Sequence, residues 1–227
     1  MKKIFYILLV FLISAGTIYA QKESKDTKQN KYKLFSSVGI FAGSDLTSLS
    51  GDAPKDVSYG SKPGIMAGIS VEFNITDDIK LLLQPMYSIR YTKGLFDIGE
   101  PDPLDSMRTK FEYIRVPLSA KINAFNGVTY FVGGLDFGYL LNASLYDIEK
   151  VNGERDIKNI LNEIDLAALF GVGVNFKIAS NFLYFELRYE QSLLNMSNTD
   201  ANANSGYFPS RFRLGGFQLF TGFNFSL

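Results

Sequence analysis

The stretch FLYFELRYEQSLL, residues 182–194, alternates between apolar and polar side chains with a period of two. One face of an extended chain would carry Leu183, Phe185, Leu187, Tyr189 and Leu193. The opposite face would carry Tyr184, Glu186, Arg188, Glu190 and Ser192. A period of two is the period of a β-strand, whose successive side chains point to opposite faces. The stretch therefore predicts a strand with one apolar and one charged face.

The same alternation recurs along the chain, at residues 33–43, 63–75, 79–92, 111–123, 129–141, 164–178 and 218–227. With the first stretch this makes about eight strands, each long enough for the ~9–11 residues that a tilted strand needs to cross a bilayer. The predicted connections are tight at 76–78, 125–127 and 178–181, and long and polar at 44–62, 94–110, 143–162 and 195–210. Short turns at one end and long loops at the other are typical of outer-membrane barrels. We therefore expect an all-β fold, an eight-stranded antiparallel up-and-down transmembrane β-barrel over residues 33–227.

Alternation alone does not say which face of the barrel points inward, and a soluble, lipocalin-like periplasmic binding barrel shares the period. Small residues crowd the polar face, as a narrow lumen requires: Gly39, Gly68, Gly134, Gly138, Gly171, Gly173 and Gly222. Tyrosines cluster near strand ends, as in the aromatic girdles of membrane barrels: Tyr87, Tyr91, Tyr139, Tyr189 and Tyr207. These features favour a membrane barrel with its polar face inside.

Charges of both signs occupy the predicted inner face, and we expect them to pair across the lumen because buried charges are normally paired. The predicted network comprises Glu72, Lys80, Arg90, Arg115, Lys121, Asp136, Asp165, Lys177, Glu186, Arg188 and Glu190. Glu186 and Glu190 could alternatively be a pair of catalytic carboxylates. The chain has no His and no Cys, however, and no nucleophile or metal cluster accompanies the two glutamates. We therefore expect a structural network, no enzyme activity, and no cofactor or metal site.

Two local features are less regular. Pro85 and Pro117 fall inside neighbouring predicted strands, where proline is usually excluded, so we expect a bulge or a local break at each. The stretch DIKNILNEI, residues 156–164, spaces Ile157, Ile160, Leu161 and Ile164 like a short amphipathic helix. It could equally continue a hairpin above the membrane, and the spacing does not decide between these two structures.

The N-terminus carries the pattern of a secretory signal peptide. Lys2 and Lys3 precede an apolar run from Ile4 to Ile13, and small residues lead to Ala20. We expect a signal peptide over residues 1–20, cleaved near Ala20 and Gln21, and a flexible tail over residues 21–32. Position 21 is not Cys, so no lipoprotein anchor is expected. The predicted location is the outer membrane, in contact with its lipid.

The last residues, QLFTGFNFSL, form a strand that would close the ring, because lipid tolerates no open sheet edge. The ending resembles the C-terminal signal read by the outer-membrane barrel assembly machinery. The matching positions are Gly222, Phe225 and Leu227, although such signals often end in Phe.

The stretch YIRVPLSAKI, residues 113–122, resembles the Tyr-x-x-Val/Ile-Pro-Leu strand of the Bacteroidetes outer-membrane β-barrel family, described as porin-family or PorT-like. The glycine-rich strands SVGIFAG and FGVGVNF agree with this resemblance, which covers about residues 33–227. It implies an outer-membrane location and an OmpA- or OmpX-like barrel, and PorT itself is associated with type IX secretion.

These observations lead to a functional hypothesis with one main alternative. We expect a structural or interaction role, in which the barrel presents surface loops or assists an envelope or secretion assembly whose partner the sequence does not name. The alternative is a small porin-like channel for solutes. Lysine and arginine balance aspartate and glutamate at 23 each, so the chain carries no electrostatic footprint for nucleic acid.

Overall fold

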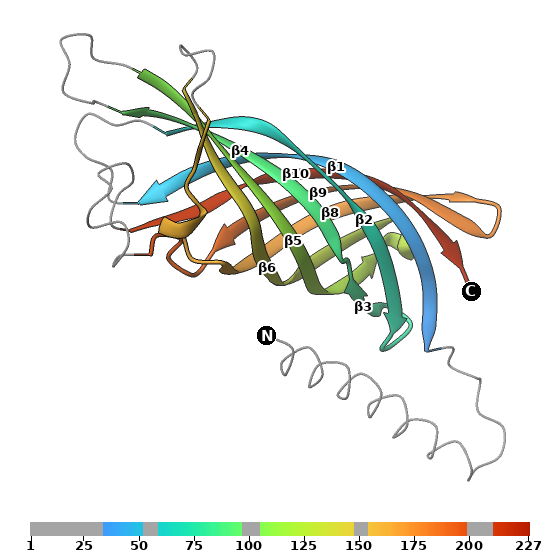
Figure 1. Cartoon of the computed structure of the whole chain (residues 1–227). Helices are drawn as coiled ribbons and strands as arrows, with labels where there is room; N and C mark the ends of the chain where they lie inside the picture. The colour runs from blue at the N-terminus through green and yellow to red at the C-terminus, as the bar shows by residue number, and fades with distance from the viewer. Residues whose placement is uncertain (1–33, 52–58, 97–104, 148–153, 199–210) are drawn as a thin grey trace, which may run out of the picture. The chain divides into compact units, whose positions relative to one another are not determined.

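Eight strand positions form a closed antiparallel ring (Figure 1). The computed structural model describes residues 34–51, 59–96, 105–147, 154–198 and 211–227. The ring strands are β1 Phe35–Gly51, β2 Tyr59–Asn74, β3 Ile79–Leu83 with β4 Met86–Phe96, β5 Asp105–Ala124, β6 Thr129–Asp147, β8 Ile164–Ile178, β9 Asn181–Ser192 and β10 Phe212–Ser226. A short strand, β7 Glu154–Asp156, pairs with β6 and with no other strand of the described residues. The predicted eight-stranded up-and-down fold is confirmed.

The first and last strands close the ring. β1 pairs with β10 without a register shift from Ser37↔Ser226 to Gly51↔Phe212, and with β2 on its other side. The Leu227 N–H donates to the Ser36 carbonyl at 3.1 Å. The C-terminal stretch is therefore the closing strand that its alternation predicted, and it leaves no open edge at this seam.

β3 and β4 are two parts of one strand position, because both pair with β2 and with β5. The break falls at Gln84 and Pro85, as predicted for Pro85. The second predicted irregularity is wrong in detail, since β5 runs unbroken through Pro117, which pairs with Asp136 of β6. Pro117 lies beside the same break, and its carbonyl accepts the Gln84 N–H at 3.1 Å. The single break between β3 and β4 thus accommodates both Pro85 and Pro117.

The predicted tight connections lie between β2 and β3, at η1 Phe125–Gly127, and between β8 and β9. The long connections are shorter than predicted. β1 runs to Gly51 and β2 begins at Tyr59, so most of 44–62 is strand, and β4, β5 and β6 also extend into the predicted loops. In the stretch TSLSG the outward Ser48 and Ser50 are polar and the inward Leu49 is apolar, so the contrast between the faces seen elsewhere in the wall is lost and alternation does not reveal the strand.

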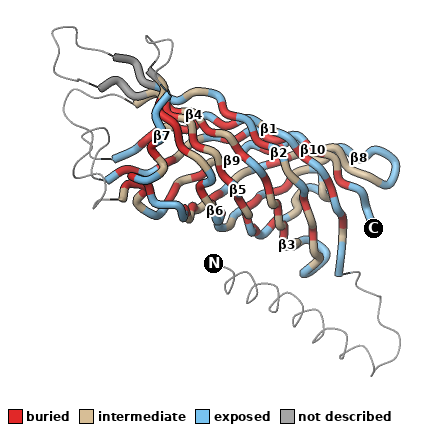
Figure 2. The backbone as a smooth tube through the Cα atoms, viewed as in Figure 1, coloured by how far each residue is buried: buried red, intermediate tan, exposed pale blue. Residues whose placement is uncertain are grey.

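The two faces of the wall have opposite chemistry, and buried and exposed residues alternate along the strands (Figure 2). Large apolar side chains point outward, among them Ile65, Leu187 and Phe217, which are 63%, 49% and 55% exposed. Polar and charged side chains point inward and are buried. This is the reverse of a soluble ligand-binding barrel, whose apolar face lies inside, and it contradicts the lipocalin-like alternative. Within the described ranges, no helix is long and apolar enough to cross a membrane.

Of the two structures that the sequence left open for residues 156–164, the hairpin is present next to β7, whereas the helix is reduced to one turn and Ile164 lies outward in β8. β7 continues a hairpin with β6, and η2, a single 3-10 turn at Lys158–Ile160, follows it. The predicted signal peptide and tail, residues 1–32, lie outside the described residues, as does Tyr207.

Candidate functional site

The centre of the lumen is occupied by a buried charge network around Glu190. Arg90 donates from Nη1 to Glu190 Oε1 and from Nη2 to Oε2, both at 3.0 Å. Arg115 also donates to Oε1, and Gln218 Nε2 donates to Oε2 at 2.6 Å. Each of these side chains is at most 2% exposed. Bidentate, charge-assisted contacts of this kind fix both partners in one geometry.

Two aspartates complete the coordination of the arginines. Arg90 Nε lies 3.0 Å from Asp45 Oδ2, and Arg115 Nη2 lies 3.1 Å from Asp136 Oδ2. Asp45 also accepts the Thr47 hydroxyl at 2.8 Å. The network therefore joins β1, β4, β5, β6, β9 and β10 across the lumen. Asp165 lies apart from the ion pairs and accepts the Ser192 hydroxyl at 2.9 Å.

Further charge clusters fill the lumen toward the tight turns. Arg188 pairs with Glu186 and donates to Gln84 Oε1 at 2.7 Å, while Tyr130 donates to Glu186 at 3.0 Å. Nearer the turns, Glu72 pairs with Lys121 at 2.6 Å and with Lys80 at 2.9 Å, and it accepts Asn224 Nδ2 at 3.1 Å. Salt bridges thus occupy several depths of the barrel.

Apolar and aromatic side chains pack between these charge clusters: Phe41, Met66, Leu82, Met86, Tyr130, Val132, Tyr184 and Phe220. Glycines make room for the two tyrosines. A Cβ at Gly173 would lie 2.1 Å from the Tyr130 ring, and a Cβ at Gly222 would lie 2.6 Å from the Tyr184 ring. The glycines on the inner face therefore have the space-making role that a narrow lumen predicts.

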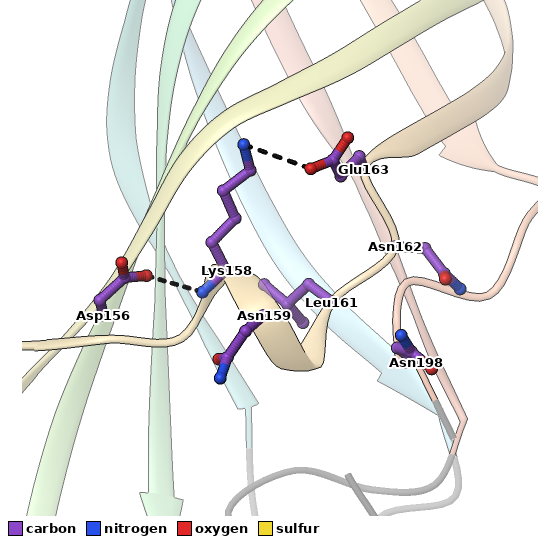
Figure 3. Close-up of a pocket in the computed structure, with 7 residues that line it drawn as sticks. All are labelled: Asp156, Lys158, Asn159, Leu161, Asn162, Glu163 and Asn198. Atoms are coloured by element: carbon purple, nitrogen blue, oxygen red, sulfur yellow. Dashed lines mark hydrogen bonds and ion pairs between the residues drawn. The ribbon is translucent and has the colours of Figure 1, made fainter. Parts of the chain in front are cut away.

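The outer surface of the segment after β7 carries a shallow polar pocket of about 540 Å³ at the long-loop end (Figure 3). Lys158 Nζ lies 3.4 Å from Glu163 Oε1, and the Lys158 N–H donates to Asp156 at 2.9 Å. The remaining lining residues are Asn159, Leu161, Asn162 and Asn198. Lys158 and Glu163 are partly solvent-exposed and already satisfy each other. The pocket therefore presents amides rather than a pair of reactive groups.

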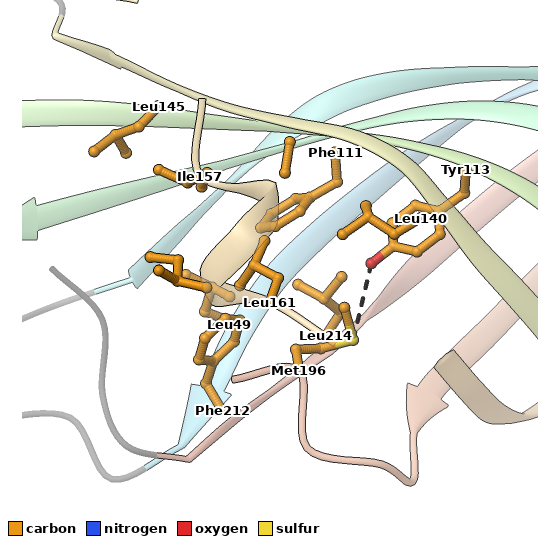
Figure 4. Close-up of a cluster of buried hydrophobic side chains, with 12 residues drawn as sticks. Leu49, Phe111, Tyr113, Leu140, Leu145, Ile157, Leu161, Met196, Phe212 and Leu214 are labelled. Carbon is orange, nitrogen blue, oxygen red and sulfur yellow. Dashed lines mark hydrogen bonds between the residues drawn. The ribbon is translucent and has the colours of Figure 1, made fainter. Parts of the chain in front are cut away.

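The underside of the same segment closes the barrel mouth with apolar side chains, which we name the outer cap (Figure 4). The cap comprises Ile157, Ile160 and Leu161 of this segment together with Met196, which follows β9. They pack on barrel residues Leu49, Phe111, Tyr113, Leu140, Ala143, Leu145, Phe212 and Leu214. Backbone hydrogen bonds fix it: Ile157 N–H to the Ala143 carbonyl at 3.0 Å, and Asn198 N–H to the Ile160 carbonyl at 3.0 Å. The lumen is covered at this end by an apolar layer.

Lys177 differs from the expectation that it belongs to the inner network. It is exposed, one residue before β8 ends at the tight turn, and no ion pair joins it within the described ranges. At the rim an ammonium group keeps its hydration and needs no partner. The proposed assembly-signal residues are divided between the faces: Gly222 faces the lumen against Tyr184, whereas Phe225 and Leu227 are 49% and 59% exposed.

Reasoning from the sequence missed Asp45, Gln84 and Gln218 as network members, and missed the outer cap. Asp45 fell in a predicted loop, although it continues the inward alternation of Phe41 and Gly43. The apolar spacing of residues 157–161 was the available signal for the cap. Among the described residues, no group of His, Cys, Asp and Glu could hold a metal ion. The site is thus a lumen filled with side chains, whose ion pairs and hydrogen bonds join the strands of the wall.

The chain is similar to one protein family and to several solved structures. No curated protein matches the chain. Among solved structures, Neisserial surface protein A is 16% identical, with a TM-score of 0.46 over 83% of this chain and 97% of its own. OprG of Pseudomonas aeruginosa is 9% identical, with a TM-score of 0.45 over 85% of this chain and 94% of its own. The family model described as outer membrane protein beta-barrel domain matches residues 19–198. The chain belongs to this outer-membrane β-barrel family.

Proposed function

We propose that this protein is a closed outer-membrane barrel with a structural or interaction role, which presents its long connections or assists an envelope or secretion assembly, as the PorT-like resemblance implies. The observation that carries the proposal is the filled lumen. Ion pairs cross it at the Glu190 network, and the outer cap covers it. A barrel of about eight strands has an interior just wide enough for side chains.

The competing function is a small channel for solutes. A channel would need the Arg90–Glu190 and Arg115–Glu190 pairs to separate and the cap to move aside. Separating a buried pair leaves charges uncompensated, which is costly. The closed state is therefore the one that the interior side chains stabilise.

The end with the long connections is the surface we propose for interaction. Tight turns connect the strands at the opposite end, so loop variation is concentrated beside the outer cap. We further propose export through a signal peptide cleaved near Ala20, and recognition of the last strand, with Gly222, Phe225 and Leu227, by the barrel assembly machinery.

Conductance in a planar lipid bilayer tests the closed barrel. The wild type should insert, shift on gels when heated, and show no steady, porin-sized current. The heat-dependent gel shift of protein recovered from the same bilayer-forming vesicles serves as the control that a silent membrane contains folded barrel. A stable, porin-sized conductance from the wild type would overturn the proposal and favour the channel.

Photo-crosslinking in native membranes tests the interaction role. A crosslinker at Asn159, which is exposed on the outer end, should capture a discrete protein adduct. The same crosslinker at Ser180, in the tight turn between β8 and β9, is the matched control at the other end. Equal adducts at both positions, or none at Asn159, would contradict an interaction surface at the long-loop end.

A further inference from the structure

The outward face of β2, β4 and β5 changes chemistry abruptly toward the long-loop end. Along β5 the outward side chains are apolar from Ile122 to Ile114, and then become Glu112, Lys110 and Arg108. Tyr87 and Tyr139 flank Ile114 at the last apolar row, in the pairs Tyr87↔Ile114 and Ile114↔Tyr139. Tyrosines at such a boundary mark the level of the lipid headgroups. The charged rows therefore begin at the membrane interface.

Three cations lie together farther toward the long-loop end, and we name them the rim cation cluster: Lys62, Lys93 and Arg108. On β4, Lys93 is the next outward residue after Tyr91, and on β5, Arg108 is the third outward residue after Ile114. Lys93 and Arg108 are direct cross-strand partners on β4 and β5. Lys62 of β2 pairs with Tyr91 of β4, two residues before Lys93, so it lies on the strand beside the Lys93–Arg108 row. Like charges directly opposite each other destabilise a sheet unless a counter-charge joins them.

The carboxylates near the cluster already have other partners. Glu112 pairs with Lys110 at 2.5 Å and accepts the Tyr87 hydroxyl at 2.9 Å. Glu154 accepts the Tyr146 hydroxyl at 2.7 Å. Among the carboxylates whose side chains the structure describes, none forms an ion pair with Lys62, Lys93 or Arg108. The cluster therefore presents positive charge outward, next to Tyr91, the last outward tyrosine of β4.

Aromatic contact orients one of the three cations. The Arg108 guanidinium lies 5.4 Å from the centroid of the Tyr91 ring, within the range of a cation–π interaction. This contact leaves the guanidinium edge free to donate two parallel hydrogen bonds to a phosphate. Below it, Ile65 and Ile89 offer an apolar surface for an acyl chain.

We propose that Lys62, Lys93 and Arg108 bind the phosphate group of a membrane lipid in the leaflet at the long-loop end. The phosphate supplies the counter-charge for the Lys93–Arg108 row, while the acyl chains continue down the apolar wall of β2 and β4. This site lies on the outside of the barrel. Lipid binding at this site therefore does not depend on whether the lumen is closed.

Native mass spectrometry of the full-length, detergent-solubilised barrel tests the site, with dimyristoyl phosphatidic acid and dimyristoyl phosphatidylcholine as probes. The wild type should retain phosphatidic acid in preference to phosphatidylcholine. The Lys93→Gln/Arg108→Gln variant should lose about tenfold or more in that preference, since basic groups near a membrane surface dominate binding to anionic lipid. The charge-preserving Lys93→Arg/Arg108→Lys variant should keep most of the preference.

The matched control is Lys177→Gln/Arg213→Gln, which removes the same number of exposed cations from β8 and β10. It should keep the wild-type preference. The proposal is overturned if the Lys93/Arg108 variant binds phosphatidic acid as the wild type does, or if the control loses as much. Displacement of the lipid by inorganic phosphate at equal concentration would also overturn it, because the site would then select free phosphate rather than a lipid.

Discussion

Glu190 and Arg90 meet from opposite sides of the ring and share two hydrogen bonds of 3.0 Å across the lumen. β4 and β9 lie four strand positions apart in a ring of eight, so this pair spans the full width of the barrel. Arg90 also reaches Asp45 on β1, and Glu190 also accepts from Gln218 on β10. The pair therefore braces the wall as well as filling the space inside it.

Glu190→Ala should destabilise the barrel strongly, because it leaves Arg90 and Arg115 partly unpaired in a buried site. Removing one partner of a buried pair costs about 3–5 kcal/mol. Urea unfolding in lipid vesicles, followed by the loss of the heat-dependent gel shift, would measure this cost. Glu163→Ala is the control, since that carboxylate is exposed and bonds only to Tyr139 and Lys158 at the surface. Equal midpoints for the two variants would contradict a structural role for Glu190.

Gly173→Ala should destabilise the barrel through a steric clash. Its added methyl would lie 2.1 Å from the Tyr130 ring, whereas a methyl at Gly133 meets nothing within 4 Å. Overpacking typically costs about 1–3 kcal/mol, while Gly→Ala at an unstrained site is neutral or stabilising by about 0.4–1 kcal/mol. The same vesicle unfolding assay should therefore separate the two variants. Gly173→Ala should cost less in a Tyr130→Leu background than in the wild type, and an equal cost in both backgrounds would place the strain elsewhere.

Much of this fold is predictable from the sequence because membrane and lumen impose opposite chemistry on the two faces of each strand. Wherever the wall lies in lipid, as at Leu187 and Glu186, the contrast between the two faces is strong. It predicts where each strand lies, which face points inward, and how many strands there are. Toward the long-loop end the outward side chains become polar and the inward ones partly apolar, as at Ser48 and Leu49, so the ends of β1 and β2 were mistaken for loop, and Asp45 with them. The break at Pro85 was predictable because proline lacks the N–H that the ladder needs.

The contacts made by the inner side chains were less predictable than their direction. Alternation places Arg90 and Glu190 inside, but their pairing depends on ring position and depth, which follow from the register of all eight strands. The outer cap is a second example. Ile157 and Ile160 were recognised as apolar, yet their packing site includes Phe111 and Leu214 from strands distant in sequence. Nonlocal packing of this kind leaves no local pattern in the chain.

Leu187→Arg should destabilise the barrel according to its depth in the bilayer. Leu187 is outward-facing, 49% exposed, and pairs with Val172 and Leu219 in the middle of the apolar band. Arginine at the midplane of a membrane barrel costs about 2–4 kcal/mol, falling to about 0–1 near the interface. Leu193→Arg, beyond the end of β9, is the matched control. The difference between the two variants should grow in vesicles of thicker lipid, and a cost independent of thickness would show that Leu187 does not face lipid.

Ile160→Asp should release the outer cap without unfolding the barrel. Ile160 is 8% exposed against Phe111 and its neighbours, and a buried, unpaired carboxylate is costly, so the segment should move into water. The strands below the cap retain their ladders and the Glu190 network. Limited proteolysis should then cleave within residues 154–163, while the remaining protein still shows the heat-dependent gel shift. The control is Asn159→Asp, which adds the same charge at the adjacent exposed position and should leave the segment protected. Cleavage of both variants at equal rates would mean that the apolar contacts of Ile160 do not hold the cap, and global loss of the gel shift would mean that the cap folds only together with the barrel.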